Sequence, residues 1–116
     1  MSDFVFLFRS TPQSAHDVMD VPERARESLQ AWFTWIRDLE RRGHLKHPGQ
    51  PLARTGRVVR GAEVTDGPFV EVKDMVLGFI VVEAEDITQA VALTAGCPLV
   101  AGGGSVEVRP VETLPI

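Results

Sequence analysis

The sequence predicts an α+β domain with the ferredoxin-like split βαβ plan and an inserted β-hairpin. Three observations lead to this fold class. The chain has 116 residues, which is the length of one domain (1–116). Its strand-like and helix-like stretches follow each other as strand, helix, strand pair, strand, helix and strand. Two of these strands are apolar at nearly every position, which is typical of strands that are covered on both faces.

The first part of the chain predicts one strand and one long helix. Residues 4–8 are all apolar and predict the first buried strand. Residues 9–20 form a polar connection that contains a proline, and we expect a loop there. A helix is predicted to begin at Pro22, which suits the first helical position, and to close at Gly43, which suits a C-terminal cap. Between them apolar side chains recur at helical spacing.

The middle of the chain predicts a β-hairpin. Residues 44–55 contain two prolines and a glycine, and we expect an irregular linker. The β-prone residues 57–60 and 63–65 flank Gly61-Ala62, and a Gly-X pair in this position is typical of a type II′ turn. A second tight turn, residues 66–69 (DGPF), then leads into the next strand.

The last part of the chain predicts a strand, a helix and a final strand. Residues 75–82 are apolar apart from one glycine. A helix is expected to begin at Asp86, whose carboxylate can cap it, with Gln89 completing a pattern similar to a capping box. This helix should end before Pro98, and residues 106–109 alternate as the last strand.

The burial pattern also predicts how the chain assembles. Two helices can cover only one face of a four-stranded sheet, but the strands at residues 4–8 and 75–82 are apolar on both sides. A second copy, packed sheet against sheet around a two-fold axis, would cover the other face. We therefore expect a homodimer with a barrel-like middle, which is a dimeric α/β barrel.

Composition excludes several classes of protein. The formal net charge of −4 argues against a nucleic-acid binder, because such a protein needs a basic stripe to neutralise phosphates. No apolar stretch is long enough to span a bilayer. The single cysteine excludes an internal disulfide and fits a reducing compartment. The chain begins without the features of a signal peptide, so we expect a cytoplasmic protein with no membrane partner.

Several motifs of the second half agree with one known family in order and spacing. These are the hairpin, the DGPF turn at residues 66–69, Glu71 and Lys73, Gly78, Cys97-Pro98 and the run 106–111. Residues 55–111 resemble the DGPF branch of the YCII-related proteins. The resemblance implies a ferredoxin-like dimer. It also implies an association with alternative sigma factors of the extracytoplasmic-function class, because genes of this branch often neighbour theirs.

The resemblance implies little about chemistry. Many members of the wider family carry a His on the first helix near an Asp in the loop after the second helix, and this pair was proposed to be catalytic. The corresponding positions here are Trp32 and Cys97. A general base can be made from an imidazole held by a carboxylate, but not from an indole beside a thiol. The acid–base proposal therefore does not transfer to this chain.

The DGPF turn and the tryptophans each allow two interpretations. Asp66 can accept N–H bonds within the turn while Phe69 packs into the core, or the turn can shape the mouth of a pocket between helix and sheet, with Phe69 as its apolar wall. Trp32 and Trp35 lie three apart on the predicted helix. They can both be core residues, or Trp32 can face that pocket.

The remaining site candidates are Glu71, Cys97 and Arg109. Glu71 with Lys73, and Arg109 with Glu107, would project on one face of a strand. Each pair can form ion pairs across strands, or form a polar floor on which Arg109 binds a carboxylate or phosphate. Cys97 is expected to follow the C-terminal end of a helix, where the dipole disfavours a thiolate, so an inert buried thiol is favoured over a nucleophile.

Neither a metal nor a cofactor is expected. His44 and His47 form an H-x-x-H pair, but zinc would need two more ligands at suitable spacing. Two functions remain open. One is a small-molecule binding or accessory protein, associated with sigma-factor signalling. The other is a cofactor-independent enzyme acting on a small metabolite, with Asp66, Glu71 or Arg109 as its polar groups.

Overall fold

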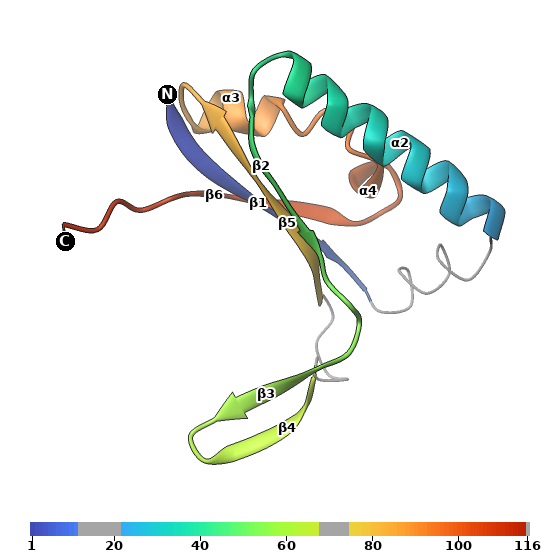
Figure 1. The fold of residues 1–116 in the computed structure, drawn as a ribbon, viewed down its shortest axis with the longest axis vertical. Coiled ribbons are helices and arrows are strands. Elements are labelled where there is room, and N and C mark those ends of the chain that lie inside the picture. The colour runs from blue at the N-terminus through green and yellow to red at the C-terminus, as the bar shows by residue number, and fades with distance from the viewer. Residues whose placement is uncertain (12–21, 68–74, 116) are drawn as a thin grey trace.

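The computed structural model describes residues 1–11, 22–67 and 75–115 of the chain. The predicted α+β class is confirmed: a four-stranded antiparallel sheet, a two-stranded sheet and three helices make up this part of the protein (Figure 1). The elements are β1 (Ser2–Ser10), α2 (Pro22–Arg41), β2 (Leu45–Pro51), β3 (Gly56–Arg60), β4 (Glu63–Gly67), β5 (Met75–Ala84), α3 (Ile87–Ala92), α4 (Pro98–Ala101) and β6 (Ser105–Pro110).

The main sheet has the strand order β2-β5-β1-β6, and each neighbouring pair is antiparallel. The register places Phe6 of β1 opposite Ile80 of β5 and Val108 of β6, so their side chains share one face. That face is covered by the helices, because Phe6 and Ile80 join the same buried cluster as Leu39 of α2 and Ala90 of α3. The hydrophobic core therefore lies between one face of the sheet and the helices.

The two central strands alternate in burial. On β1, Phe4, Phe6 and Phe8 are buried, whereas Val5 and Leu7 between them are half-buried. The second face of the sheet is thus apolar but partly exposed in the single chain. A second copy that covers this face stays a prediction.

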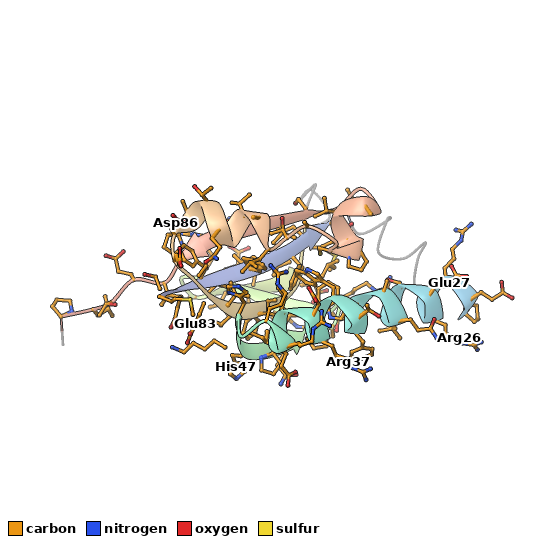
Figure 2. All side chains as sticks on the ribbon, turned by 90° about the horizontal axis from the view of Figure 1, so that it is seen from above. Arg26, Glu27, Arg37, His47, Glu83 and Asp86 are labelled. Atoms are coloured by element: carbon orange, nitrogen blue, oxygen red, sulfur yellow. The ribbon has the colours of Figure 1, made fainter. Side chains whose placement is uncertain are left out.

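Helix α2 has the start and the length that its sequence predicts. It runs from Pro22 to Arg41, and Gly43 follows in a left-handed conformation with φ of 79°. The N–H of His44 then donates to the carbonyl of Leu39 at 2.9 Å, which satisfies a free carbonyl at the helix end. The charged side chains Arg26, Glu27 and Arg37 point outward from this helix (Figure 2).

The cap of α3 is also confirmed. The Asp86 carboxylate accepts a hydrogen bond from the N–H of Gln89 at 2.8 Å, and the Gln89 side chain accepts one from the N–H of Glu85 at 2.7 Å. The single helix predicted up to Pro98 is wrong in one respect. α3 ends at Ala92, and the proline begins the short helix α4 instead. Proline fits there because the first helical N–H needs no intrahelical partner.

The irregular linker predicted for residues 44–55 is wrong, because residues 45–51 form the edge strand β2. Its pairing with β5 shifts register twice, between Leu45 and His47 and between His47 and Gln50. An edge strand tolerates prolines, since one row of its N–H groups has no strand to bond. Because of its prolines and its irregular register, local sequence patterns do not predict this strand.

The predicted hairpin is confirmed as β3 and β4, which form a sheet of their own. Gly61 has φ of 62° and Ala62 does not have positive φ, which are the signs of a type II′ turn. The hairpin projects away from the main sheet (Figure 1). The projecting hairpin helps to explain the radius of gyration of 15.5 Å, since a compact domain of this length has a radius of about 13 Å.

Candidate functional site

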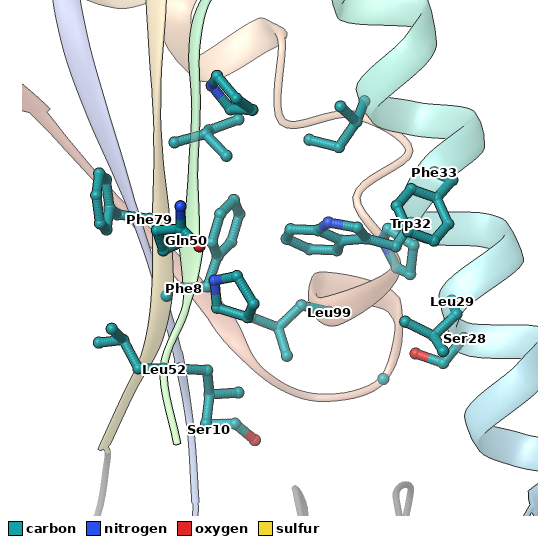
Figure 3. A pocket seen from close by; sticks show the side chains of 18 of the residues that line it. Phe8, Ser10, Ser28, Leu29, Trp32, Phe33, Gln50, Leu52, Phe79 and Leu99 are labelled. Carbon is teal, nitrogen blue, oxygen red and sulfur yellow. The ribbon is translucent and has the colours of Figure 1, made fainter. Parts of the chain in front are cut away.

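A cleft of about 650 Å³ opens between α2 and the main sheet (Figure 3). This volume lies within the usual range for small-molecule sites, which is roughly 300–1,000 Å³. Phe8 of β1 and Ile80 of β5 line it from the sheet, on the same face as the core. The cleft is therefore continuous with the hydrophobic core.

A β-bulge shapes the floor of the cleft. Phe8 pairs with Gly78, but the next residue of β1, Arg9, pairs with Val76. Leu77 is thus an extra residue on β5, and it lines the cleft together with Phe8. Bulges of this kind re-aim side chains and are frequent beside functional sites.

The C-terminal end of β2 forms one wall, and two glycines allow it to approach the sheet. A Cβ atom at Gly49 would overlap the carbonyl oxygen of Phe79, and one at Gly78 would lie 2.7 Å from the carbonyl oxygen of Gln50. Because neither glycine has a Cβ, β2 can lie directly against β5. This places Pro51 and the residues after it along the cleft.

The middle of α2, residues 28–36, forms the opposite wall. Ser28, Leu29, Trp32, Phe33 and Ile36 face the cleft at helical spacing. None of them is fully buried, and Leu29 and Phe33 are 47% and 53% exposed. The buried residues of this helix, Trp35 and Leu39, do not line the cleft. Trp32 and Ile36 line the cleft and also pack against the core cluster, so the apolar stripe of α2 serves both.

The core interpretation holds for Trp35, and the cleft interpretation holds for Trp32. Trp35 is a core residue: it is 5% exposed, and its indole N–H donates to the carbonyl of Leu93 at 3.1 Å. Trp32 is half-buried and lines the cleft, with its ring edge-to-face against Phe8 at a centroid distance of 4.5 Å. The Trp32 and Trp35 rings themselves are 5.4 Å apart. Ring contacts with the core residues Phe8 and Trp35 therefore hold Trp32 in place.

Helix α4 closes one end of the cleft with Pro98 and Leu99. Cys97 precedes this helix rather than following the end of one, so the predicted dipole environment is wrong. The thiol is 2% exposed and belongs to the core, and it does not line the cleft. Burial raises the pKa of Cys97, and hydrogen bonds from the N–H groups of Leu99 and Val100 oppose this more weakly.

The described lining of the cleft contains few polar groups. Arg54 is its one charged residue, and Ser10, Ser28 and Gln50 are the uncharged polar ones. Ser10 is 4% exposed and is the buried polar residue of the described chain.

The other predicted site residues lie elsewhere or outside the described residues. Asp66 is on β4, with a side chain 92% exposed, and pairs with Arg57 at 3.1 Å. Arg109 is on β6 opposite Val5, so it lies on the face of the sheet away from the helices. Phe69 and Glu71 fall in the segment 68–74, outside the described ranges. Of the predicted residues that are described, the structure therefore brings only Trp32 to the cleft.

Both histidines of the H-x-x-H pair have local partners. The Nδ1 atom of His44 lies 2.8 Å from the carbonyl oxygen of Glu83, and that of His47 accepts a hydrogen bond from the N–H of Gly49 at 2.9 Å. In residues 1–11, 22–67 and 75–115, no three His, Cys, Asp or Glu side chains are grouped as metal ligands. None of the described helices has the length and apolar character needed to cross a membrane.

Comparison with known proteins identifies the family of this chain. No curated protein matches the sequence. The family model of the YCII-related domain matches residues 3–115, which is nearly the whole chain and includes every described strand and helix except the first residue of β1. The protein with this apolar cleft therefore belongs to the YCII-related domain family.

Proposed function

We propose that this protein binds a small, largely apolar molecule in the cleft between α2 and the sheet. The observation that carries this proposal is the cleft of about 650 Å³ with mostly apolar described walls. Leu29, Phe33 and Leu52 stand on these walls, and each keeps about half of its surface exposed. A ligand that removes this surface from water gains roughly 25 cal/mol for each Å² of apolar area.

Binding is better supported than catalysis. General acid–base chemistry needs a group that exchanges protons near neutral pH. The described residues that line the cleft include no His, Asp, Glu, Lys, Tyr or Cys, which are the residue types that usually act as general acids or bases. Asp66 and Arg109, two polar groups that the enzyme alternative would use, lie away from the cleft. The described walls thus favour recognition of a molecule over its conversion.

We further propose a ferredoxin-like homodimer. The strand order β2-β5-β1-β6, with α2 between β1 and β2 and helices α3 and α4 between β5 and β6, supports the ferredoxin-like plan. The second face of the sheet carries half-buried Val5, Leu7, Phe79 and Val81. In Figure 3 the Phe79 ring lies on the side of the sheet away from Trp32. A second copy packed on this face would form the dimeric α/β barrel.

An accessory role would follow from such a dimer. A ligand that changes the fit between α2 and the sheet could alter a surface that another protein recognises. The association with sigma-factor signalling rests on the resemblance of residues 55–111 to the DGPF branch. This association would give the proposed small-molecule binding protein a protein partner. It would not change the ligand that the cleft binds.

The binding proposal can be tested with naphthalene as a probe, followed by nuclear magnetic resonance. The two tryptophans give two indole N–H signals, which the variant Trp32→Phe assigns. Naphthalene should shift the Trp32 signal progressively. The Trp35 signal should shift less, because its N–H is bonded to Leu93 inside the core.

A matched pair of variants locates the site. Phe33→Ser removes apolar surface at the cleft and should weaken binding. Val59→Ser removes a side chain that is 69% exposed on the projecting hairpin and should leave binding unchanged. If neither indole signal moves up to the solubility limit of naphthalene, or if both variants bind equally, the cleft is not the site.

A further inference from the structure

The strand β6 forms a regular outer edge of the main sheet. It is the last strand in the order β2-β5-β1-β6, and it pairs with β1 without a shift of register. The opposite edge strand, β2, contains Pro48 and Pro51 and shifts register twice, which are features that hinder pairing with a further strand. In β6 the one proline is the last residue, Pro110. Of the two edges of the described sheet, β6 is therefore the one to which another strand can add.

A hydrogen bond at the end of β6 fixes which backbone groups face this edge. The N–H of Val111 donates to the carbonyl of Asp3, just before the paired part of β1, at 3.0 Å. In an antiparallel ladder the N–H and carbonyl groups of alternate residues point to the same neighbour, so every second residue back from Val111 bonds to β1. The N–H and carbonyl groups of Val106 and Val108, which lie between them, point away from β1 to the outer edge.

The side chains of β6 fit a second copy of the same strand. When two copies pair antiparallel about a two-fold axis at Val108, Glu107 of each chain lies opposite Arg109 of the other. On the helix-covered face, Val108 meets its own copy and Val106 meets Pro110. The Glu107 and Arg109 side chains are 41% and 67% exposed, so both are accessible to a partner. Each pairing is thus apolar with apolar or acid with base.

Charge selects this register over its neighbours. Because each side chain must stay on its own face, the partner strand can move only in steps of two residues. One step in either direction places Glu107 opposite Glu107 or Arg109 opposite Arg109, and like charges directly opposite are destabilising. Within the chain Glu107 already lies 3.3 Å from Arg9 and 3.8 Å from Arg109. The partner's Arg109 would extend this ion-pair ladder, so charge complementarity favours a second copy as the occupant.

We propose that β6 pairs edge to edge with β6 of a second copy, centred on Val108, so that the main sheets of two protomers join into one. This contact goes beyond the face-to-face dimer proposed above. Its two-fold axis is perpendicular to the sheet and leaves the second face free, so both contacts can coexist in a closed tetramer. One strand pair is a small contact, and we expect a Kd on the order of 0.1–1 mM. Dilute protein should therefore show the face-to-face dimer alone.

A charge-swap series tests the contact in a Val81→Lys background. Val81 is half-buried on the second face and separated from β6 by β1, so a lysine there should remove the face-to-face contact and spare the edge. Association is measured by small-angle X-ray scattering up to about 1 mM protein. Glu107→Arg and Arg109→Glu each place like charges opposite at two points, and each should weaken association at least about 10-fold. An equal mixture of the two variants, or the double variant, restores opposite charges and should associate like the background protein.

Nuclear magnetic resonance on a mixture of isotope-labelled and unlabelled wild-type chains places the contact without any substitution. A non-hydrogen-bonded antiparallel pair brings its Cα–H groups close, so Glu107 of one chain should give a filtered Overhauser signal with the partner's Arg109. Sheets stacked face to face lie roughly 10 Å apart and cannot give this signal.

The inference is overturned if the mixed variants associate no better than either variant alone. It is also overturned if the filtered signals of β6 are absent at high concentration or join it to another segment of the partner. A wild-type chain that forms no face-to-face dimer contradicts the dimer proposed above, whereas the charge-swap series still decides the edge contact.

Discussion

Replacing Gly49 by alanine should detach the β2 wall of the cleft. Gly49 has φ of 62°, a backbone conformation that costs an L-residue roughly 1–2 kcal/mol. It also lies against β5: an added Cβ would overlap the carbonyl oxygen of Phe79 and lie 2.5 Å from its carbonyl carbon. Both of these are backbone atoms, so no side chain can rotate away, and the strands themselves must separate.

A matched control separates the two causes of the stability loss expected for Gly49→Ala. Gly43 also has positive φ, 79°, but a Cβ there would meet nothing within 4 Å. Gly43→Ala should therefore show the backbone cost alone, roughly 1 kcal/mol. Gly49→Ala adds overpacking, which typically costs 1–3 kcal/mol or more, so we expect a total loss of about 3 kcal/mol. For a domain of this size that is a fall in Tm of about 12 °C, against about 4 °C for the control.

Denaturant unfolding at one fixed protein concentration measures both losses, because dimerisation would make the apparent stability depend on concentration. Gly49→Ala should also weaken naphthalene binding, since Pro51 and Leu52 move with the wall. Gly43→Ala should bind naphthalene normally. Equal losses of stability in the two variants would refute the argument, because they would show that β2 does not lie against the carbonyl of Phe79.

Three further predictions concern the core, the thiol and the assembly. Trp35→Ala should cost about 3–5 kcal/mol as a buried aromatic, whereas Trp32→Ala should cost about half of that. Trp32→Ala should also abolish probe binding. Denaturant unfolding measures the stability losses, and titration calorimetry measures binding because this variant lacks the Trp32 signal. Because burial raises the pKa of Cys97 in the folded state, the contribution of this thiol to stability should be constant below the ordinary thiol pKa of about 8.5. It should then fall as the pH rises further, by up to about 1.4 kcal/mol per pH unit, and Cys97→Ala should lack this fall in denaturation series at pH 7 to 10. Leu7→Lys on the second face of the sheet should convert a dimer to a monomer in light scattering, whereas Val91→Lys on exposed α3 should not; a wild-type monomer would contradict the proposed dimer.

The elements that the sequence predicts well are those with local determinants. The N-terminal proline and the left-handed Gly43 bound α2, and Asp86 caps α3, all through groups within four residues of the helix end. The hairpin turn likewise needs only the positive φ of Gly61. Local backbone and capping energies decide these features, so they can be inferred without knowing the rest of the fold.

The strand β2 and the floor of the cleft depend on distant partners. Residues 45–51 are a strand because β5 pairs with them, and their own prolines argue against it. Leu77 lines the cleft because of a one-residue register shift between β1 and β5, and no local pattern shows such a shift. Ser10 could have been placed on the Phe8 face by simple alternation, but the polar residues after Phe8 predict a loop rather than two more residues of strand.

The two positions that the resemblance assigns to a His–Asp pair now have different environments. Trp32 lies on the cleft wall in contact with Phe8, whereas Cys97 is buried behind α4 with a raised pKa. A large apolar ring at the first position adds hydrophobic surface to the cleft, and a buried neutral thiol at the second adds packing to the core. The environment of Trp32 therefore agrees with the proposed binding of a largely apolar molecule in the cleft, and Cys97 contributes to the core instead.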